Sequence, residues 1–196
     1  MARTSMPAMR RDVALRRIAH FLIALTPLYY ALPVELPILS VHRWALVVVF
    51  FSGVCVFETY RLWKGITFLG LRPHEKEQIA SFAWAAAGIT AVLWLCPHDV
   101  AAAALVGMAF VDPLAGELRK SRSDSVAVGS SLALYFALAF CVLFLWEWRD
   151  DALVLVLAAL GAVTAVAAER TKVRYVDDDF LMLVVPGAVM TALTLI

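Results

Sequence analysis

The sequence predicts an all-α membrane protein, a bundle of about seven transmembrane helices whose N-terminus lies in the cytoplasm. Hydrophobic residues make up 63% of its 196 residues, charged residues only 17%, and the mean hydropathy is +0.82. Soluble domains contain about half apolar and about a quarter charged residues. The apolar runs approach the roughly 20 residues that a helix needs to cross a bilayer, and they lack the alternation of membrane β-strands.

Short connections join these runs into a single transmembrane domain over residues 1–196. The candidate spans are about 16–33, 44–63, 78–97, 100–118, 126–147, 151–168 and 180–196. The basic stretch MARTSMPAMRRDVALRR precedes the first span. Because six further spans follow and no small-residue cleavage site is present, we do not expect it to be removed as a signal peptide.

The basic residues predict the orientation of the bundle. One side of the expected membrane receives fifteen of the 17 Lys and Arg residues: Arg3, Arg10, Arg11, Arg16, Arg17, Arg61, Lys64, Arg72, Lys76, Arg119, Lys120, Arg122, Arg170, Lys172 and Arg174. The other side receives only Arg43 and Arg149. Basic residues concentrate in cytoplasmic loops, so the first side is cytoplasmic.

A carboxylate occurs inside the fourth span, where the apolar run VAAAALVGMA leads directly into FVDPLAGELRK. Asp112 lies six residues before Leu118, which is about 9 Å below the cytoplasmic end of a helix. Pro113 removes a backbone donor, and Gly116 loosens the helix further. Broken helix at membrane depth is tolerated only against protein or water. The segment therefore predicts a polar cavity that opens to the cytoplasm.

Other charged residues are expected at the same side of the membrane. Glu58 and Arg61 stand three apart near the end of the second span, and Arg16 and His20 share a face of the first. The last connection carries Glu169 and then the run Asp177–Asp179. Each has a plainer interpretation: an internal ion pair, an interfacial histidine, and acids that cap a helix. For each of these residues, a role in a shared site and the plainer structural role both stay open at this point.

The residue types favour one kind of chemistry. Carboxylates without a Cys/His cluster suit a hard cation, Mg²⁺ above all, which binds carboxylates together with phosphate oxygens. Neighbouring arginines and lysines suit phosphate. A cytoplasmic cavity within the bilayer suits a lipid whose headgroup meets a soluble nucleotide. No Walker A pattern occurs, so any nucleotide is held in another way.

These segments resemble the CTP-dependent lipid kinases, the family of dolichol, phytol and diacylglycerol or polyprenol kinases, which are similar to phosphatidate cytidylyltransferases. Five stretches carry the resemblance in order: RRIAHFLIALTPLYY with Arg17 and His20, FETYRLWKG with Glu58 and Arg61, LRPHEKEQIASFAWAAAG with Arg72 and Glu75, VDPLAGELRK with Asp112, and AAERTKVRYVDDDF with Glu169, Asp177 and Asp178.

The sequence departs from the family pattern in the stretch associated with CTP. Gly129 and Ser130 match its Gly-Ser, but Ser125 stands at the lysine position and Val128 at the glutamate position. Asp179 also stands where the family usually has Asn.

The resemblance implies phosphorylation of a membrane lipid alcohol (polyprenol, phytol-like or diacylglycerol) by CTP at the cytoplasmic face. It implies that Asp112, Asp177 and Asp178 hold Mg²⁺ and that Glu58 or Glu169 is the general base. Phosphate and nucleotide contacts would come from Arg61, Arg72, Arg119, Lys120, Arg122, Gly129 and Ser130, with His20, Arg17 and Glu75 nearby.

Two alternatives remain: CMP transfer to a lipid phosphate, and a catalytically degenerate lipid-binding membrane protein. We expect an integral protein of a bacterial or archaeal cytoplasmic membrane, with lipid and nucleotide partners and no nucleic acid. The small-residue stretches AGITA and LGAVTA also leave a homodimer open.

Overall fold

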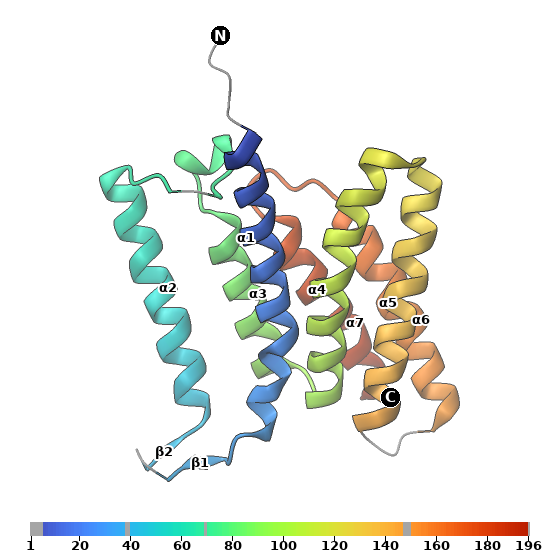
Figure 1. Ribbon diagram of the computed structural model, residues 1–196. Helices are drawn as coiled ribbons and strands as arrows, with labels where there is room; N and C mark the ends of the chain where they lie inside the picture. The colour runs from blue at the N-terminus through green and yellow to red at the C-terminus, as the bar shows by residue number, and fades with distance from the viewer. Residues whose placement is uncertain (1–5, 38–39, 69, 147–149, 196) are drawn as a thin grey trace.

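The computed structural model describes residues 6–37, 40–68, 70–146 and 150–195, and these residues form seven α-helices (Figure 1). The helices are α1 (Met6–Leu25), α2 (Trp44–Lys64), α3 (Ser81–Leu95), α4 (His98–Ser121), α5 (Asp124–Trp146), α6 (Asp151–Arg170) and α7 (Asp178–Thr194). Two 3₁₀ helices, η1 (Thr26–Ala31) and η2 (Pro73–Lys76), and a hairpin of β1 (Glu35–Leu36) and β2 (Val41–His42) complete the described chain. The prediction of an all-helical fold is confirmed.

Four helices, α2, α4, α5 and α6, are long and apolar enough to cross a membrane. Helix α3 is equally apolar but has only 15 residues. The first predicted span, 16–33, differs most from the structure, since α1 begins at Met6 and ends at Leu25. Pro27 explains the end, because it lacks a backbone N–H and its ring clashes with the preceding turn.

The chain changes direction at each connection, so the start of α1 and the 65–80, 122–123 and 171–177 connections lie at one end of the bundle (Figure 1). We call this the basic end, because most described Lys and Arg residues lie there. Arg43 lies at the opposite end and donates to the carbonyl oxygens of Tyr30 (3.1 Å) and Leu32 (2.9 Å). Arg3 and Arg149, two of the basic residues from which the orientation was predicted, lie outside the described residues.

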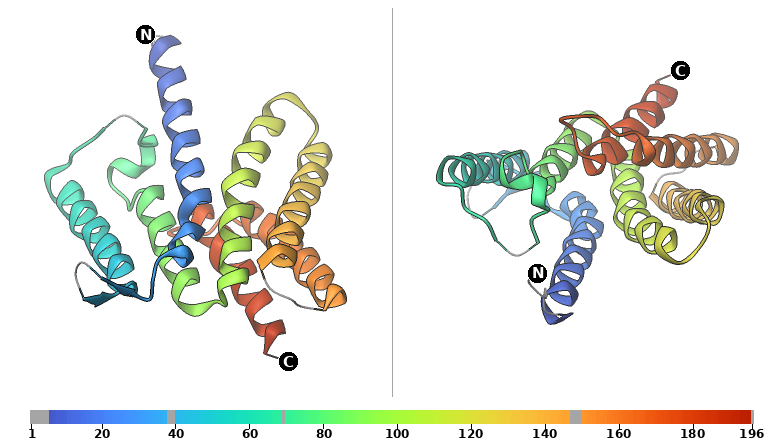
Figure 2. Two further views of the ribbon diagram at one scale, coloured as in Figure 1. Left: turned by 60° about the horizontal axis from the view of Figure 1, so that its bottom comes forward. Right: turned by 90° about the horizontal axis from the view of Figure 1, so that it is seen from above.

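Helix α4 is the centre of the bundle and packs against α1, α3, α5, α6 and α7 (Figure 2). Its alanine-rich stretch from Val100 to Leu105 is buried, and small side chains let neighbouring helices approach closely. The ring of Tyr135 on α5 lies against Gly107 of α4, where a Cβ would be 2.4 Å from Cε2. The fold therefore holds α4 firmly among its neighbours.

Helix α4 also corrects one prediction. It continues without a break through Pro113 to Ser121, although the sequence predicted a broken helix there. Neighbouring helices bury most of the helix, and a proline inside a membrane helix is tolerated when its surroundings accommodate the freed carbonyl. The expected polar cavity is nevertheless present beside Asp112 and Pro113.

Candidate functional site

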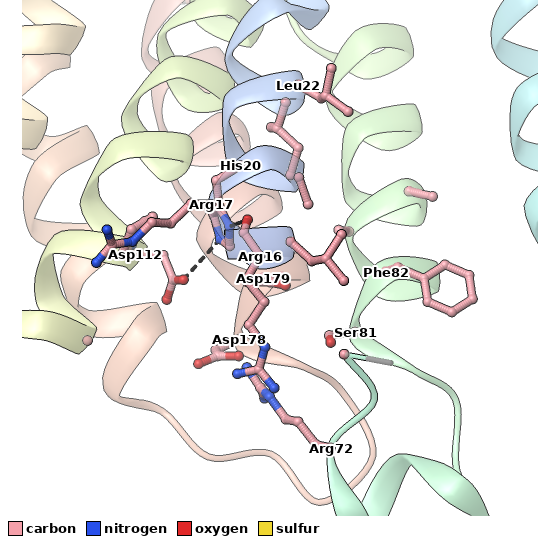
Figure 3. Close-up of a pocket in the computed structure, with 18 of the residues that line it drawn as sticks. Arg16, Arg17, His20, Leu22, Arg72, Ser81, Phe82, Asp112, Asp178 and Asp179 are labelled. Atoms are coloured by element: carbon pink, nitrogen blue, oxygen red, sulfur yellow. Dashed lines mark hydrogen bonds and ion pairs between the residues drawn. The ribbon is translucent and has the colours of Figure 1, made fainter. Parts of the chain in front are cut away.

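A cavity of about 730 Å³ lies at the basic end of the bundle, bordered by α1, α3, α4, the start of α7 and the 65–80 connection (Figure 3). Its polar wall contains acidic and basic side chains from α1, the 65–80 connection, α4, the end of α6 and the start of α7: Arg16, Arg17, His20, Arg72, Glu75, Asp112, Glu117, Arg119, Lys120, Glu169, Asp178 and Asp179. Residues more than 150 positions apart in the chain thus line one hollow.

Three carboxylates from three helices meet in the wall of this cavity. Asp112 of α4, Glu169 of α6 and Asp178 of α7 each present one oxygen, and these oxygens all lie within 4.8 Å of one another. Glu169 is buried and the two aspartates are half-buried. We call these three residues the carboxylate cluster. Their spacing is close enough for one cation to contact all three.

A histidine adjoins the carboxylate cluster from α1. The Nε2 atom of His20 lies 3.0 Å from Oδ2 of Asp112, and its Nδ1 atom lies 2.7 Å from the carbonyl oxygen of Arg16 (Figure 3). A carbonyl oxygen only accepts, so Nδ1 carries a hydrogen and Nε2 is directed at Asp112. His20, Asp112 and buried Asp179 form a second group with potential ligand atoms within 4.8 Å of one another.

The start of α7 explains how the adjacent aspartates acquire different positions. Asp177 is the N-cap of α7, and its Oδ1 accepts from the backbone N–H of Asp178 at 2.9 Å. Asp178 and Asp179 follow in the first helical turn, where the helix dipole favours negative charge. Asp177 is thus held as a helix cap outside the cavity wall, whereas Asp178 and Asp179 line the cavity.

Asp177 instead pairs with the 65–80 connection, since Nη1 of Arg72 lies 3.4 Å from its Oδ1. Burial, with a further contribution from Asp178, raises the pKa of Asp177 to about 7. The sequence placed Asp177 beside Asp112 and Asp178 as a metal ligand. The structure gives it a capping role next to the cluster, and puts Glu169 and Asp179 near Asp112.

Cationic side chains surround the mouth of the cavity. Arg119 pairs with Glu169, while Arg17 and Lys120 both lie near Oε1 of Glu117, at 3.2 and 3.4 Å. These three cations are partly or largely exposed. Arg17 and Lys120 share a partner, Glu117, that is itself exposed, so these two cations can reorient toward an anion that enters the cavity without leaving a buried charge unpaired.

Glu75 shapes the neighbouring wall. Its carboxylate accepts from the backbone N–H of Arg72 (2.6 Å) and from the backbone N–H (3.0 Å) and hydroxyl (2.6 Å) of Ser81. Burial alone would raise the pKa of Glu75, but these hydrogen bonds together outweigh it and hold the pKa below its usual value. Glu75 thus ties the connection that carries Arg72 to the first residue of α3.

The structure corrects the role expected of Glu58 and Arg61. Nε and Nη2 of Arg61 donate to the two oxygens of Glu58 at 2.6 and 2.7 Å, and the backbone N–H of Ala80 donates to Oε1 at 2.7 Å. Arg61 also donates to the carbonyl oxygen of Gln78 at 2.8 Å. Both charged side chains are buried and lie outside the cavity wall. The pair joins α2 to the start of α3 and has the geometry of the internal ion pair of the plainer interpretation; neither side chain lines the cavity.

Gly129, Ser130 and Arg122 also lie outside the cavity wall. Gly129 lies on an exposed part of α5, and Arg122 caps the exposed end of α4. The stretch that resembles a nucleotide motif is therefore not placed to contact the carboxylate cluster.

Asp179 is the site residue that the sequence interpretation left out of its ligand set. Asp179 shares a helix face with the buried residues Met182 and Leu183, three and four positions later. That helical spacing indicates that the side chain of Asp179 faces inward. It would have identified Asp179, and not Asp177, as the residue on the buried face of the helix.

Comparison with known protein families, curated proteins and solved structures gives no match to this chain.

Proposed function

We propose that the protein is a lipid kinase that transfers the γ-phosphoryl group of CTP to a membrane lipid alcohol. The observation that supports this function best is the convergence of Asp112, Glu169 and Asp178 in one cavity whose mouth carries Arg17, Arg119 and Lys120. Carboxylates below and cations above are the two kinds of group that a metal-bound polyphosphate requires.

In the proposed arrangement all seven helices cross the membrane of a bacterium or archaeon, with the N-terminus and the basic end in the cytoplasm. The concentration of described Lys and Arg residues at that end supports this orientation. It would give the carboxylate cluster access to a soluble nucleotide and, within the bilayer, to a lipid headgroup.

The residues of the cluster fit Mg²⁺. The donors are all carboxylate oxygens, and Oδ1 of Asp178 is buried without a hydrogen-bond partner among the described residues. A buried, unpaired carboxylate oxygen is costly unless a ligand satisfies it. Asp112, Glu169 and Asp178 would hold the ion, which when bound neutralises charge on the phosphate oxygens.

In this proposal, different cavity residues bind phosphate, position Asp112 and accept the proton. Arg72 and Lys120 bind phosphate oxygens, and His20 positions Asp112 through its Nε2 atom. Asp179 accepts the proton of the lipid hydroxyl as the hydroxyl oxygen bonds to the γ-phosphorus and the bond from that phosphorus to the β-phosphate oxygen breaks. The products are the lipid phosphate and CDP.

Asp179 replaces Glu58 and Glu169 in the role of base. Glu58 is enclosed in an ion pair outside the cavity, and Glu169 is paired with Arg119. Asp179 is buried, lines the cavity and has no ion pair with an Arg or Lys side chain among the described residues.

Purified protein in lipid bilayers, given Mg²⁺ and CTP labelled separately at the γ and α phosphates, tests the proposal. We expect γ label in the lipid, and a loss of about 10³-fold in Asp112→Asn because a group that acts on the transferring phosphoryl is removed. The matched control is Asp151→Asn, an exposed aspartate in the first turn of α6. Transfer of α label would indicate CMP transfer, and full activity of Asp112→Asn would overturn the mechanism. The same assay with ATP tests the choice of CTP.

A further inference from the structure

The cavity has a second, apolar part that the phosphoryl chemistry does not use. Away from the carboxylate cluster its wall is formed by side chains of α1, α2 and α3: Leu22, Ile23, Phe50, Phe82, Ala86 and Ile89. We call this part the apolar branch. Among the described residues that line its deeper end, Thr26 alone adds a polar group. Its composition therefore excludes a nucleotide as the natural occupant.

The apolar branch extends far below the basic end. Phe50 lies 14 residues before Lys64, the last residue of α2, which corresponds to about 21 Å along the helix. Ile89 lies eight residues after Ser81, the first residue of α3, or about 12 Å. These depths place the branch beside the hydrocarbon region if α2 crosses the bilayer as its length and composition allow.

The branch is open at one side, between α1 and α2. Helix α1 packs mainly on α4, and α2 mainly on α3, so the two flank the branch without packing together along it. Leu22 and Phe50 line the cavity and yet keep 59% and 50% of their surface exposed. Side chains that belong to both a cavity wall and the outer surface mark an opening.

We infer that the apolar branch holds the hydrocarbon chain of a lipid alcohol, which enters sideways between α1 and α2 and carries its hydroxyl up to the carboxylate cluster. This inference rests on the proposed function for its headgroup. Its geometric basis is the continuity of one cavity from Phe50 and Ile89 to Asp112 and Asp179.

The volume of the cavity indicates that only part of a lipid chain lies inside it and that the rest passes out through the opening. Its volume of about 730 Å³ is typical of a pocket for one drug-sized ligand. A nucleotide triphosphate together with a whole lipid would exceed it. Only the first part of the chain can lie inside, with the remainder in the bilayer beyond Leu22 and Phe50.

Photocrosslinking tests this placement without requiring turnover. The full chain in phosphatidylcholine bilayers is irradiated with a diacylglycerol or a polyprenol that carries a diazirine near its hydroxyl end, and the labelled residues are mapped by mass spectrometry. We expect label on Leu22, Phe50 and Ile89 that excess unlabelled lipid alcohol removes. The polyprenol and diacylglycerol arms distinguish the two sources of the chain. Label spread evenly over all outward faces, or displaced only by phospholipid, would overturn the inference.

A matched pair of variants on α1 sharpens the test. Leu22→Trp fills the mouth of the branch, whereas Leu25→Trp makes the same change on an exposed residue outside the cavity wall. We expect Leu22→Trp to reduce the competed labelling about tenfold, the loss expected when about two methylene groups are kept out of an apolar site, and Leu25→Trp to leave it unchanged. Equal effects of the two variants would also contradict the inference.

The outcomes separate this inference from the proposed function. Competed labelling of the branch without any phosphorylation would support the chain site and reject the kinase. Phosphorylation of lipid without labelling of the branch would support the kinase and reject the chain site.

Discussion

The buried pair of Glu58 and Arg61 allows a quantitative test of its structural role. In Glu58→Gln the amide oxygen can still accept from the N–H of Ala80, but the fully buried guanidinium of Arg61 loses its counter-charge. Removing one member of a buried ion pair costs about 3–5 kcal/mol. We therefore expect the free energy of unfolding to fall by about that amount.

The double variant Glu58→Gln, Arg61→Met shows whether charge is the cause. It removes the stranded guanidinium and loses mainly the hydrogen bond to the carbonyl oxygen of Gln78, so it should cost only about 1–3 kcal/mol. The double variant should thus be more stable than Glu58→Gln alone. The measurement is reversible unfolding in detergent micelles, with exposed Glu77→Gln as the control.

The same variants decide between a structural and a catalytic Glu58. If Glu58 were the general base, Glu58→Gln would lose about 10²–10⁴-fold in turnover even where it is folded. The structure predicts a change of no more than a few fold per folded molecule. Additive destabilisation in the double variant, or a large loss of turnover in folded Glu58→Gln, would refute the reasoning.

Two further predictions concern packing and pH. Gly107→Ala should destabilise the protein by about 1–3 kcal/mol, because the new Cβ would lie 2.4 Å from a ring carbon of Tyr135; Gly53→Ala, with nothing within 4 Å, should be neutral or stabilising in the same unfolding assay. Hydrogen bonds from Ser81 help to hold the pKa of Glu75 below its unfolded value, so its contribution to stability is present above the unfolded pKa and is lost as pH falls through the folded one. Between about pH 6 and pH 3 the wild type should therefore lose more stability than Glu75→Gln.

Each of these has a clear contrary result. Equal unfolding free energies for Gly107→Ala and Gly53→Ala would show that Tyr135 moves aside at no cost. Parallel pH profiles for the wild type and Glu75→Gln would show that the carboxylate of Glu75 is not held ionised by its hydrogen bonds.

Much of the fold could be predicted because apolar length and charged ends define helices directly. The second span was predicted at 44–63 and α2 is Trp44–Lys64, and the sixth was predicted at 151–168 and α6 is Asp151–Arg170. The beginning of α1 could not be predicted in this way. The stretch MPAMRRDVAL is interrupted by three consecutive charged residues, Arg10, Arg11 and Asp12, and forms helix without the continuous apolar run on which the prediction depended.

The site was harder to predict, because spacing along one helix does not reveal which neighbour a side chain faces. Asp112 stood out because a carboxylate at membrane depth is costly, and the structure places it in a cavity. Glu58 and Arg61 have the same signature, yet they face Ala80 across a helix contact. Only the packing of α2 on α3 distinguishes the two cases.

The central claim, that side chains from three helices hold one divalent cation, is tested most directly by Mn²⁺ binding. Electron paramagnetic resonance of the bilayer-embedded protein with CTP should show bound Mn²⁺ that both Asp112→Asn and Asp178→Asn abolish and that exposed Asp151→Asn retains. Bound Mn²⁺ that persists unchanged in Asp112→Asn and Asp178→Asn would contradict the account, because the ion would then lie away from the point where α4, α6 and α7 meet.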